Sequence, residues 1–263
     1  MDVTLIKYKN VNGDCELLKK HERRFAVINL LKNRKQLFFR SFERIYLIRN
    51  LMESHNLENV FHLEIDNLVY DDISKWISIF IAKKVKLAFM IDNHERATFG
   101  MCYFKNCEIL RLLTDDLNSN YLNNLPENWP NEMTALWGFL KRNPALCYIM
   151  PSLQTSNSDS DNTNHAVGEM MQKHYADFDT VFDPSTYGVY LLGRDAYHTG
   201  GRIRLNTVNP YGHIKTIPNI KWIVLDGLKK PYIINKDGSQ TLINNLHVHS
   251  KDLINGISKP YVK

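Results

Sequence analysis

Two carboxylates one residue apart, Glu64 and Asp66, follow an apolar run that begins at Val60. Because side chains alternate along an extended chain, both carboxylates are expected on one face, about 7 Å apart along the strand. Both could then approach one divalent cation, directly or through water. Hard oxygen ligands suit Mg²⁺ or Mn²⁺, ions that usually keep some water ligands and also bind substrate phosphates. The spacing therefore predicts a cation site for a phosphate-bearing ligand, although two acids that begin a solvated loop would give the same short motif.

A second group of possible ligands lies near the end of the chain. His247 and His249 are two positions apart, so on a strand they share a face, and one of them could bind the same cation. Lys251 follows and could meet a phosphate as a point charge. We expect this segment to return to the two carboxylates. The structural alternative is a pair of histidines in an ordinary β-ladder.

The elements that must position these residues alternate between helix and strand. This order predicts an α/β fold, Rossmann-like, with a mixed and mostly parallel sheet flanked by helices and a C-terminal β-ribbon. Its ligand is expected at the carboxyl ends of the strands. The chain is expected to form one domain, residues 1–263, with a mobile polar loop at about 154–164. The expected helices are 41–54, 108–122 and 131–141, the last capped by Asn131, and the expected strands are 60–65, 84–91, 98–104, 146–150, 221–225, 232–234 and 241–248.

Composition limits the class of protein. At 263 residues the chain suits one large α/β domain or two small ones. The net charge of +5 is modest, and no helix-turn-helix, zinc-finger or RNP signature is present, so we expect no nucleic-acid partner. No stretch approaches the roughly 18 apolar residues of a membrane span. The four cysteines, Cys15, Cys102, Cys107 and Cys147, show no CxxC spacing, which fits a reducing compartment. Together with the missing apolar span, this leads us to expect a soluble, cytoplasmic protein.

Three segments together resemble a known family. Residues 62–70 (HLEIDNLVY), 182–195 (FDPSTYGVYLLGRD) and 245–251 (NLHVHSK) are similar to motifs that recur in a group of nucleotide-sugar-dependent glycosyltransferases with the GT-A fold. The likeness covers about residues 38–255, and its motifs are specific in combination. It implies a UDP-sugar as the first choice of donor and a glycan or protein hydroxyl as the acceptor.

The resemblance also implies roles for single residues. Glu64 and Asp66 would fill the DxD-like metal motif, with Mn²⁺ or Mg²⁺ as the ion, and His247 or His249 would be the metal histidine. The donor-binding residues would be Lys251, Asn67 and Arg40, with Lys251 on the diphosphate. Two departures are Glu64, where Asp is commoner, and Val189, where Gln is common.

Such a transfer builds negative charge on the departing diphosphate, which a cation and Lys251 would stabilise. If the reaction inverts configuration, a carboxylate must take the proton of the acceptor. Glu132 is the first candidate for this base, since similar enzymes place an acid at this helix start, although an acid in a first helical turn also complements the helix dipole. Asp183 is the second candidate, with a structural capping role as its alternative.

Two other classes of protein remain open. An Fe(II) oxygenase could use His62, Glu64 and His247 as two histidines and one carboxylate, but it would leave Asp66 and Lys251 without a role. A sugar- or nucleotide-binding module without catalysis would be distinguished by the absence of donor turnover. The residues leave open the base, the sugar, the acceptor, the stereochemical outcome and the oligomeric state.

Overall fold

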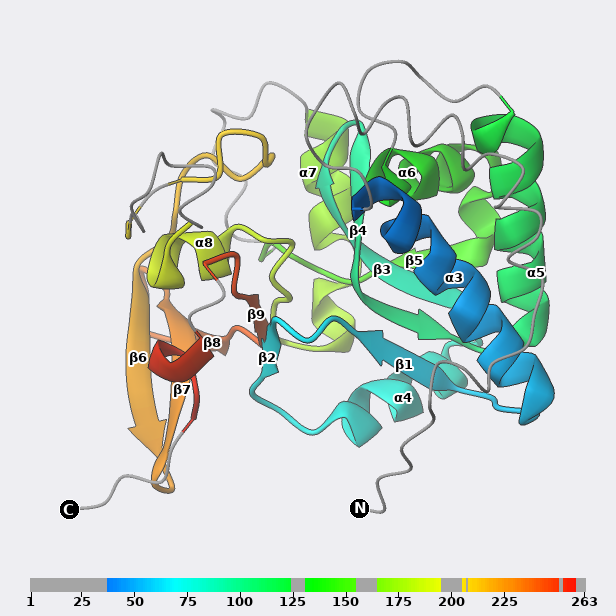
Figure 1. The fold of residues 1–263 in the computed structure, drawn as a ribbon. Coiled ribbons are helices and arrows are strands. Elements are labelled where there is room, and N and C mark those ends of the chain that lie inside the picture. The colour runs from blue at the N-terminus through cyan, green and yellow to red at the C-terminus, as the bar shows by residue number, and fades with distance from the viewer. Residues whose placement is uncertain are drawn as a thin grey trace.

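A four-stranded sheet with the order β1-β4-β3-β5 forms the centre of the fold (Figure 1). The computed structural model describes residues 37–123, 131–154, 165–194, 205–206, 208–250 and 253–258. Helices flank the sheet, so the predicted α/β fold with a mixed sheet is confirmed. The strands are β1 (Val60–Leu63), β3 (Leu87–Asn93), β4 (Arg96–Phe104) and β5 (Cys147–Ile149).

The expected predominance of parallel pairing is wrong for the described strands. β4 pairs antiparallel with both β1 and β3, and only β3 and β5 pair in parallel. The reason is the connection between β3 and β4: Asn93 and Arg96 are register partners, and a turn this short can join only antiparallel strands. Since β1 and β3 are both antiparallel to β4, strands β1, β3 and β5 run in the same direction. Their carboxyl ends therefore meet at one edge of the sheet.

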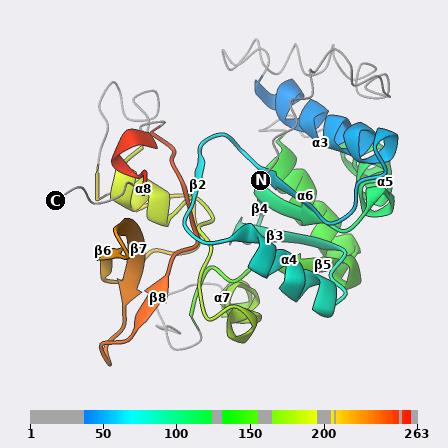
Figure 2. The same cartoon turned by 90° about the horizontal axis from the view of Figure 1, so that it is seen from below.

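Helices cover both faces of this sheet (Figure 2). Side chains of β3 alternate between the two sides: Phe89 and Ile91 belong to the larger buried cluster, and Ala88 and Met90 belong to a second cluster with Trp76 of α4. Helices α3, α5 and α6 contribute to the larger cluster. The helix bounds are α3 (Leu37–Ser54), α4 (Ile73–Ala82), α5 (Cys107–Asp116), α6 (Glu132–Arg142), α7 (His165–Gln172) and α8 (Tyr187–Leu192).

The helix starts follow from local capping, with two adjustments to the expected bounds. Asn131 caps α6 as predicted, because its side chain accepts a hydrogen bond from the Thr134 N–H at 2.9 Å. The helix expected at 41–54 begins earlier, at Leu37. The helix expected at 108–122 is divided into α5 and a π-helical segment (Leu117–Leu122). Short 3₁₀ turns lie at Pro144–Leu146, Tyr175–Asp177 and Leu253–Asn255.

The C-terminal β-ribbon is present, but the strand expected at 241–248 is two strands in different sheets. β6, β7 and β8 form the ribbon, whereas β9 leaves it and pairs antiparallel with β2. This small β2–β9 sheet joins residues 245–247 to the segment that follows β1. The bounds are β2 (Asn67–Val69), β6 (Ile220–Leu225), β7 (Leu228–Ile234), β8 (Gln240–Leu242) and β9 (Asn245–His247).

Two expectations concern single segments. Gln154, at the start of the predicted mobile loop, is buried, and residues 155–164 lie outside the described residues. Among the described helices, none combines the length and the hydropathy that crossing a bilayer requires.

Candidate metal centre

Glu64 and Asp66 lie in a turn between β1 and β2, not in a continuous strand. The Glu64 N–H donates to the Gly100 carbonyl at 2.8 Å, and the Asn67 N–H donates back to the Glu64 carbonyl at 3.0 Å. Ile65 stands at the tip of this turn with 94% of its surface exposed. The expected strand alternation is therefore not the reason that the two carboxylates share a side. They share it because the chain turns at this point, where it leaves the first sheet for the second.

His247 reaches this turn through the β2–β9 pairing, which makes it the register partner of Asn67. The Val248 N–H also donates to the Asp66 carbonyl at 2.8 Å. His247 Nε2 consequently lies 3.3 Å from Asp66 Oδ2 and 3.6 Å from Glu64 Oε2. One ligand atom from each of the three residues lies within 4.8 Å of the others, so the group could hold a metal ion.

The third segment singled out in the sequence, residues 182–195, packs against the same strand. A Cβ atom at Gly188 would lie 2.2 Å from the His247 carbonyl oxygen and 2.8 Å from Asp183 Oδ2. Only glycine allows this approach, as expected from the glycines of the segment. Three segments that are far apart in sequence thus meet at His247.

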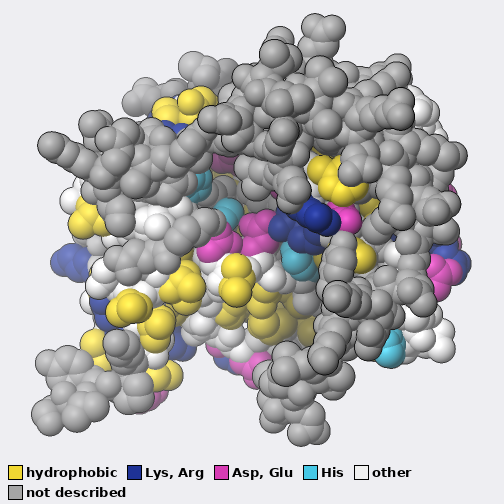
Figure 3. Space-filling view, in the orientation of Figure 1, with side chains coloured by type: hydrophobic (Ala, Val, Ile, Leu, Met, Phe, Trp, Pro, Cys, Tyr) yellow, Lys and Arg dark blue, Asp and Glu magenta, His cyan; other side chains and the backbone are white. Residues whose placement is uncertain are grey.

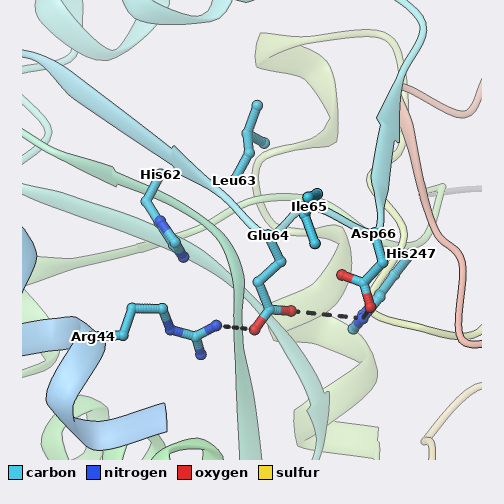
Figure 4. Close-up of a pocket in the computed structure, with 7 residues that line it drawn as sticks. All are labelled: Arg44, His62, Leu63, Glu64, Ile65, Asp66 and His247. Carbon is cyan, nitrogen blue, oxygen red and sulfur yellow. Dashed lines mark hydrogen bonds and ion pairs between the residues drawn. The ribbon is translucent and has the colours of Figure 1, made fainter. Parts of the chain in front are cut away.

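Arg44 of α3 completes the charged group. It pairs with Glu64 (Figure 4). Its Nη2 also lies 3.3 Å from Glu132 Oε1. Its guanidinium carbon is 5.2 Å from the centroid of the Phe99 ring, which supports it from the sheet. Each oxygen of Glu64 therefore faces a different basic group, Arg44 on one side and His247 on the other.

These contacts shift the ionisation of the group. Burial raises the pKa of Glu64, whereas the charges of Arg44 and His247 lower it by a larger amount. The pKa of Glu64 therefore lies below its ordinary value. Burial lowers the pKa of His247, but the hydrogen bond to Asp66 and the carboxylate charges outweigh it and leave this pKa raised. The carboxylates thus favour a positive charge at the imidazole. A bound cation would have to displace the His247 proton, because only the neutral ring can be a ligand.

These side chains surround a cavity of about 450 Å³. Acidic, basic and histidine side chains lie side by side at the centre of this face (Figure 3). Such a mixture of charges suits a ligand that carries both a cation and an anion. The cavity is lined by Arg44, His62, Leu63, Glu64, Ile65, Asp66 and His247.

Two predicted donor-binding residues lie elsewhere. Arg40 has an exposed side chain that pairs with Glu43, and the arginine one helical turn later, Arg44, lines the cavity in its place. Asn67 donates from its side chain to the Gly100 carbonyl at 3.1 Å and accepts from Asn245 Nδ2 at 2.9 Å. Its amide therefore links β2, β4 and β9.

The structure distinguishes the two candidate histidines. β9 ends at His247, and the His249 N–H donates to the His247 carbonyl at 3.0 Å, so the chain turns and the expected alternation is lost. His249 does not belong to the described group that could hold a metal ion, and the expectation that it might be the ligand is not supported. Lys251 lies outside the described residues.

Asp183 has the surroundings of a structural anchor. It is 1% exposed, and its carboxylate accepts from the backbone N–H groups of Thr186 (2.6 Å), Tyr187 (2.8 Å), Gly188 (2.8 Å) and His247 (2.9 Å). Burial raises its pKa, and these donors oppose the shift. The four donors occupy both oxygens, so the geometry favours the capping role over that of a base.

Glu132 begins α6 and touches Arg44, which offers a role besides that of a base. If the chain is the transferase that the resemblance implies, Glu132→Gln should lower donor affinity about three- to tenfold with little change in kcat, since a partly buried ion pair is worth about 1 kcal/mol. Steady-state kinetics measures both quantities, and Glu169→Gln, on the exposed face of α7, is the control. A sharp fall in kcat at unchanged donor affinity would instead establish Glu132 as the base.

Asp92 is a buried carboxylate that the sequence reasoning missed. It follows the apolar run 87–91 of β3, just as Glu64 follows β1, so the same signal was present. It pairs with Arg96 and is 2% exposed. Burial, opposed by the charge of Arg96 and reinforced by that of Asp183, raises its pKa to about 6.

This shift predicts a pH dependence of stability. The pKa of Asp92 in the folded protein lies above the ordinary value of 3.8, so the folded state is more stable when this carboxyl is protonated than when it is ionised. The stabilisation should be complete below about pH 4 and lost as the pH rises through 6, on the order of 3 kcal/mol. The side chain of the Asp92→Asn variant stays neutral at every pH. The free energy of unfolding of this variant, minus that of the wild type, should therefore rise between pH 4 and pH 8. Urea denaturation checks this, with exposed Asp226→Asn as the control, and a difference that is independent of pH would refute it.

No family model, curated protein or solved structure matches this chain.

Proposed function

We propose that the chain is a cation-dependent glycosyltransferase of the GT-A type. It would move a sugar from a nucleoside-diphosphate sugar, with UDP-sugars as the first choice, to a hydroxyl of a glycan or protein. The observation that carries this proposal is the convergence of Glu64, Asp66 and His247, with Arg44, on one cavity. Its further support is that the three segments of the family resemblance lie in contact around His247.

The ligand atoms fit a divalent cation. Two carboxylates and one imidazole combine hard oxygen donors with a nitrogen donor, a set that Mn²⁺ accepts and that Mg²⁺, which prefers oxygen, accepts less readily. When bound, the ion would supply Lewis-acid stabilisation of the departing diphosphate.

Among the described residues, Arg44 is the one that would bind the diphosphate itself. Its Nε has no hydrogen-bond partner among the described residues, while its two terminal nitrogens point at Glu64 and Glu132. A guanidinium offers five N–H donors in a planar fork, which suits phosphate oxygens. Glu64 and Glu132 would hold this fork at the edge of the cavity. Arg44 thus takes the place that the sequence assigned to Arg40.

The Fe(II) oxygenase alternative requires His62 beside Glu64 and His247. The group of described ligand atoms that lie within 4.8 Å of one another contains Asp66 in place of His62. The ring of His62 packs against Phe99, with 5.4 Å between the ring centroids. The geometry therefore supports a site with two carboxylates and one histidine.

A donor panel tests the proposal. UDP-, GDP- and TDP-sugars are incubated with the full chain with Mn²⁺ or with EDTA, and both the melting temperature and the release of nucleoside diphosphate are measured. We expect at least one donor to stabilise the fold only with Mn²⁺, by mass action, and to be turned over. Binding without turnover would indicate the binding module instead. The absence of any Mn²⁺-dependent stabilisation would reject the proposal.

A further inference from the structure

Four buried polar side chains lie outside the lining of the metal cavity, near the carboxyl end of β3. They are Asp92, Ser152, Thr186 and His213, with exposed fractions of 2%, 0%, 0% and 8%. Each has an atom without a hydrogen-bond partner among the described residues: Asp92 Oδ1, Ser152 Oγ, Thr186 Oγ1 and His213 Nε2. Buried polar atoms are nearly always paired, so four of them in one region call for an explanation. We call these four residues the polar chamber.

Backbone geometry connects the members of the chamber. A Cβ atom at Gly212 would lie 3.0 Å from Asp92 Oδ1 and 3.2 Å from Thr186 Oγ1, so both atoms face the same glycine. The next residue, His213, donates its N–H to the Asp92 carbonyl at 2.7 Å. Ser152 lies beside the residue that follows Thr186, because its carbonyl accepts a hydrogen bond from the Tyr187 hydroxyl at 2.6 Å.

One carboxylate links the chamber to the metal centre. Asp183 accepts from the Thr186 N–H at 2.6 Å and from the His247 N–H at 2.9 Å. Asp92 also interacts electrostatically with both Asp183 and His247. The chamber and the candidate cation site therefore share the carboxyl-terminal edge of the sheet, where ligands of such sheets bind.

The free atoms define the chemistry of an occupant. A carboxylate oxygen accepts hydrogen bonds, hydroxyls both donate and accept, and a neutral imidazole nitrogen does one or the other. Burial lowers the pKa of His213, as do the charges of Lys215 and His94, which favours the neutral ring. A ligand with several neighbouring hydroxyls matches this set, because each hydroxyl can donate and accept at once.

An exposed aromatic ring lies at the rim. Tyr211 is 60% exposed, and the guanidinium carbons of Arg96 and Arg194 lie 5.6 and 5.3 Å from its ring centroid. Because a tyrosine offers an apolar face with a polar end, it can hold the C–H face of a sugar ring while the chamber binds the hydroxyls.

We propose that the polar chamber binds a hydroxyl-rich carbohydrate, with Asp92 Oδ1 and Thr186 Oγ1 bonded to neighbouring hydroxyls, and that this carbohydrate is the acceptor. The role as acceptor rests on the proposed transferase function, whereas carbohydrate binding does not. Segment 208–214 covers Asp92 through the His213 bond and through Asn93 Nδ2, which donates to the Tyr211 carbonyl at 2.7 Å.

Calorimetric titration of the full chain with methyl glycosides tests the proposal. The methyl glycosides of glucose, galactose, mannose and N-acetylglucosamine are each titrated in EDTA without nucleotide. We expect at least one of them to bind, and Asp92→Asn to weaken that binding about tenfold or more, the scale of a hydrogen bond to a charged group.

A pair of threonine variants separates a binding role from a structural one. Thr186→Val removes a buried hydroxyl that lacks a described partner, so it should raise the melting temperature while it weakens glycoside binding. Thr114→Val is the matched control: this hydroxyl donates to the Leu110 carbonyl at 2.9 Å and accepts from Arg49, so its loss should lower the melting temperature and leave binding unchanged.

Each outcome decides one claim. If none of the four glycosides binds, or if Asp92→Asn and Thr186→Val bind as the wild type does, the chamber proposal is overturned. If glycosides bind through the chamber but no nucleotide sugar is turned over, the chamber stands as a carbohydrate site and the transferase function fails. If donors are turned over while chamber variants transfer normally to acceptors, the transferase function stands and the chamber is not the acceptor site.

Discussion

Asp66→Asn should lower Mn²⁺-dependent donor turnover about 10²-fold or more, the scale seen when a group that stabilises developing charge is lost. Asp66 belongs to the three-residue group that could hold a metal ion, and its side chain lies 3.3 Å from His247 Nε2. Asparagine keeps the shape of the residue but removes the negative charge, so both cation affinity and the orientation of His247 should suffer. The measurements are Mn²⁺ titration and the initial rate of nucleoside-diphosphate release.

Asp226→Asn is the matched control for this variant. Asp226 is exposed in the turn between β6 and β7, with a φ of 52° that asparagine tolerates. It should retain wild-type metal affinity and turnover. Unchanged Mn²⁺-dependent binding in Asp66→Asn would remove Asp66 from the cation site.

Asp183→Ala should reduce the free energy of unfolding by roughly 3 kcal/mol or more, the largest loss of stability that we expect from a single substitution. The alanine leaves four buried backbone N–H groups without their acceptor, at the start of α8 and on β9. Asp183→Asn should also be destabilising, because the side-chain NH2 group of asparagine would face backbone N–H groups and two donors cannot form a hydrogen bond. Urea denaturation measures both variants.

The outcome also separates the two hypotheses for Asp183. A structural anchor predicts that stability and activity fall together. If Asp183→Asn keeps wild-type stability but loses transfer to acceptor, Asp183 is the base after all.

The sequence was most informative where one local cause sets the structure. Asn131 supplies a side-chain acceptor for the first turn of α6, and the apolar runs before Glu64 and in β3 are strands, half-buried in β1 and mostly buried in β3. Strand direction was less accessible, because it depends on the turn between Asn93 and Arg96, which the apolar pattern does not mark clearly. The division of 241–248 between two sheets likewise depends on pairing with β2, a partner far away in the sequence.

The candidate site was predictable in its ligand types but not in all its residues. Glu64, Asp66 and His247 were singled out by spacing, and the structure brings them together by a turn and a small sheet that spacing alone does not reveal. Arg44 was missed in favour of Arg40, since the choice between two arginines one helical turn apart depends on how α3 lies against the sheet.

A crystal structure of the chain with Mn²⁺ and UDP tests the central claim most directly. The account predicts an anomalous Mn²⁺ peak between Glu64, Asp66 and His247, with ligand distances of about 2.0–2.3 Å, and diphosphate oxygens against the Arg44 guanidinium. A Mn²⁺ peak at other residues, or a diphosphate bound away from Arg44, would contradict it.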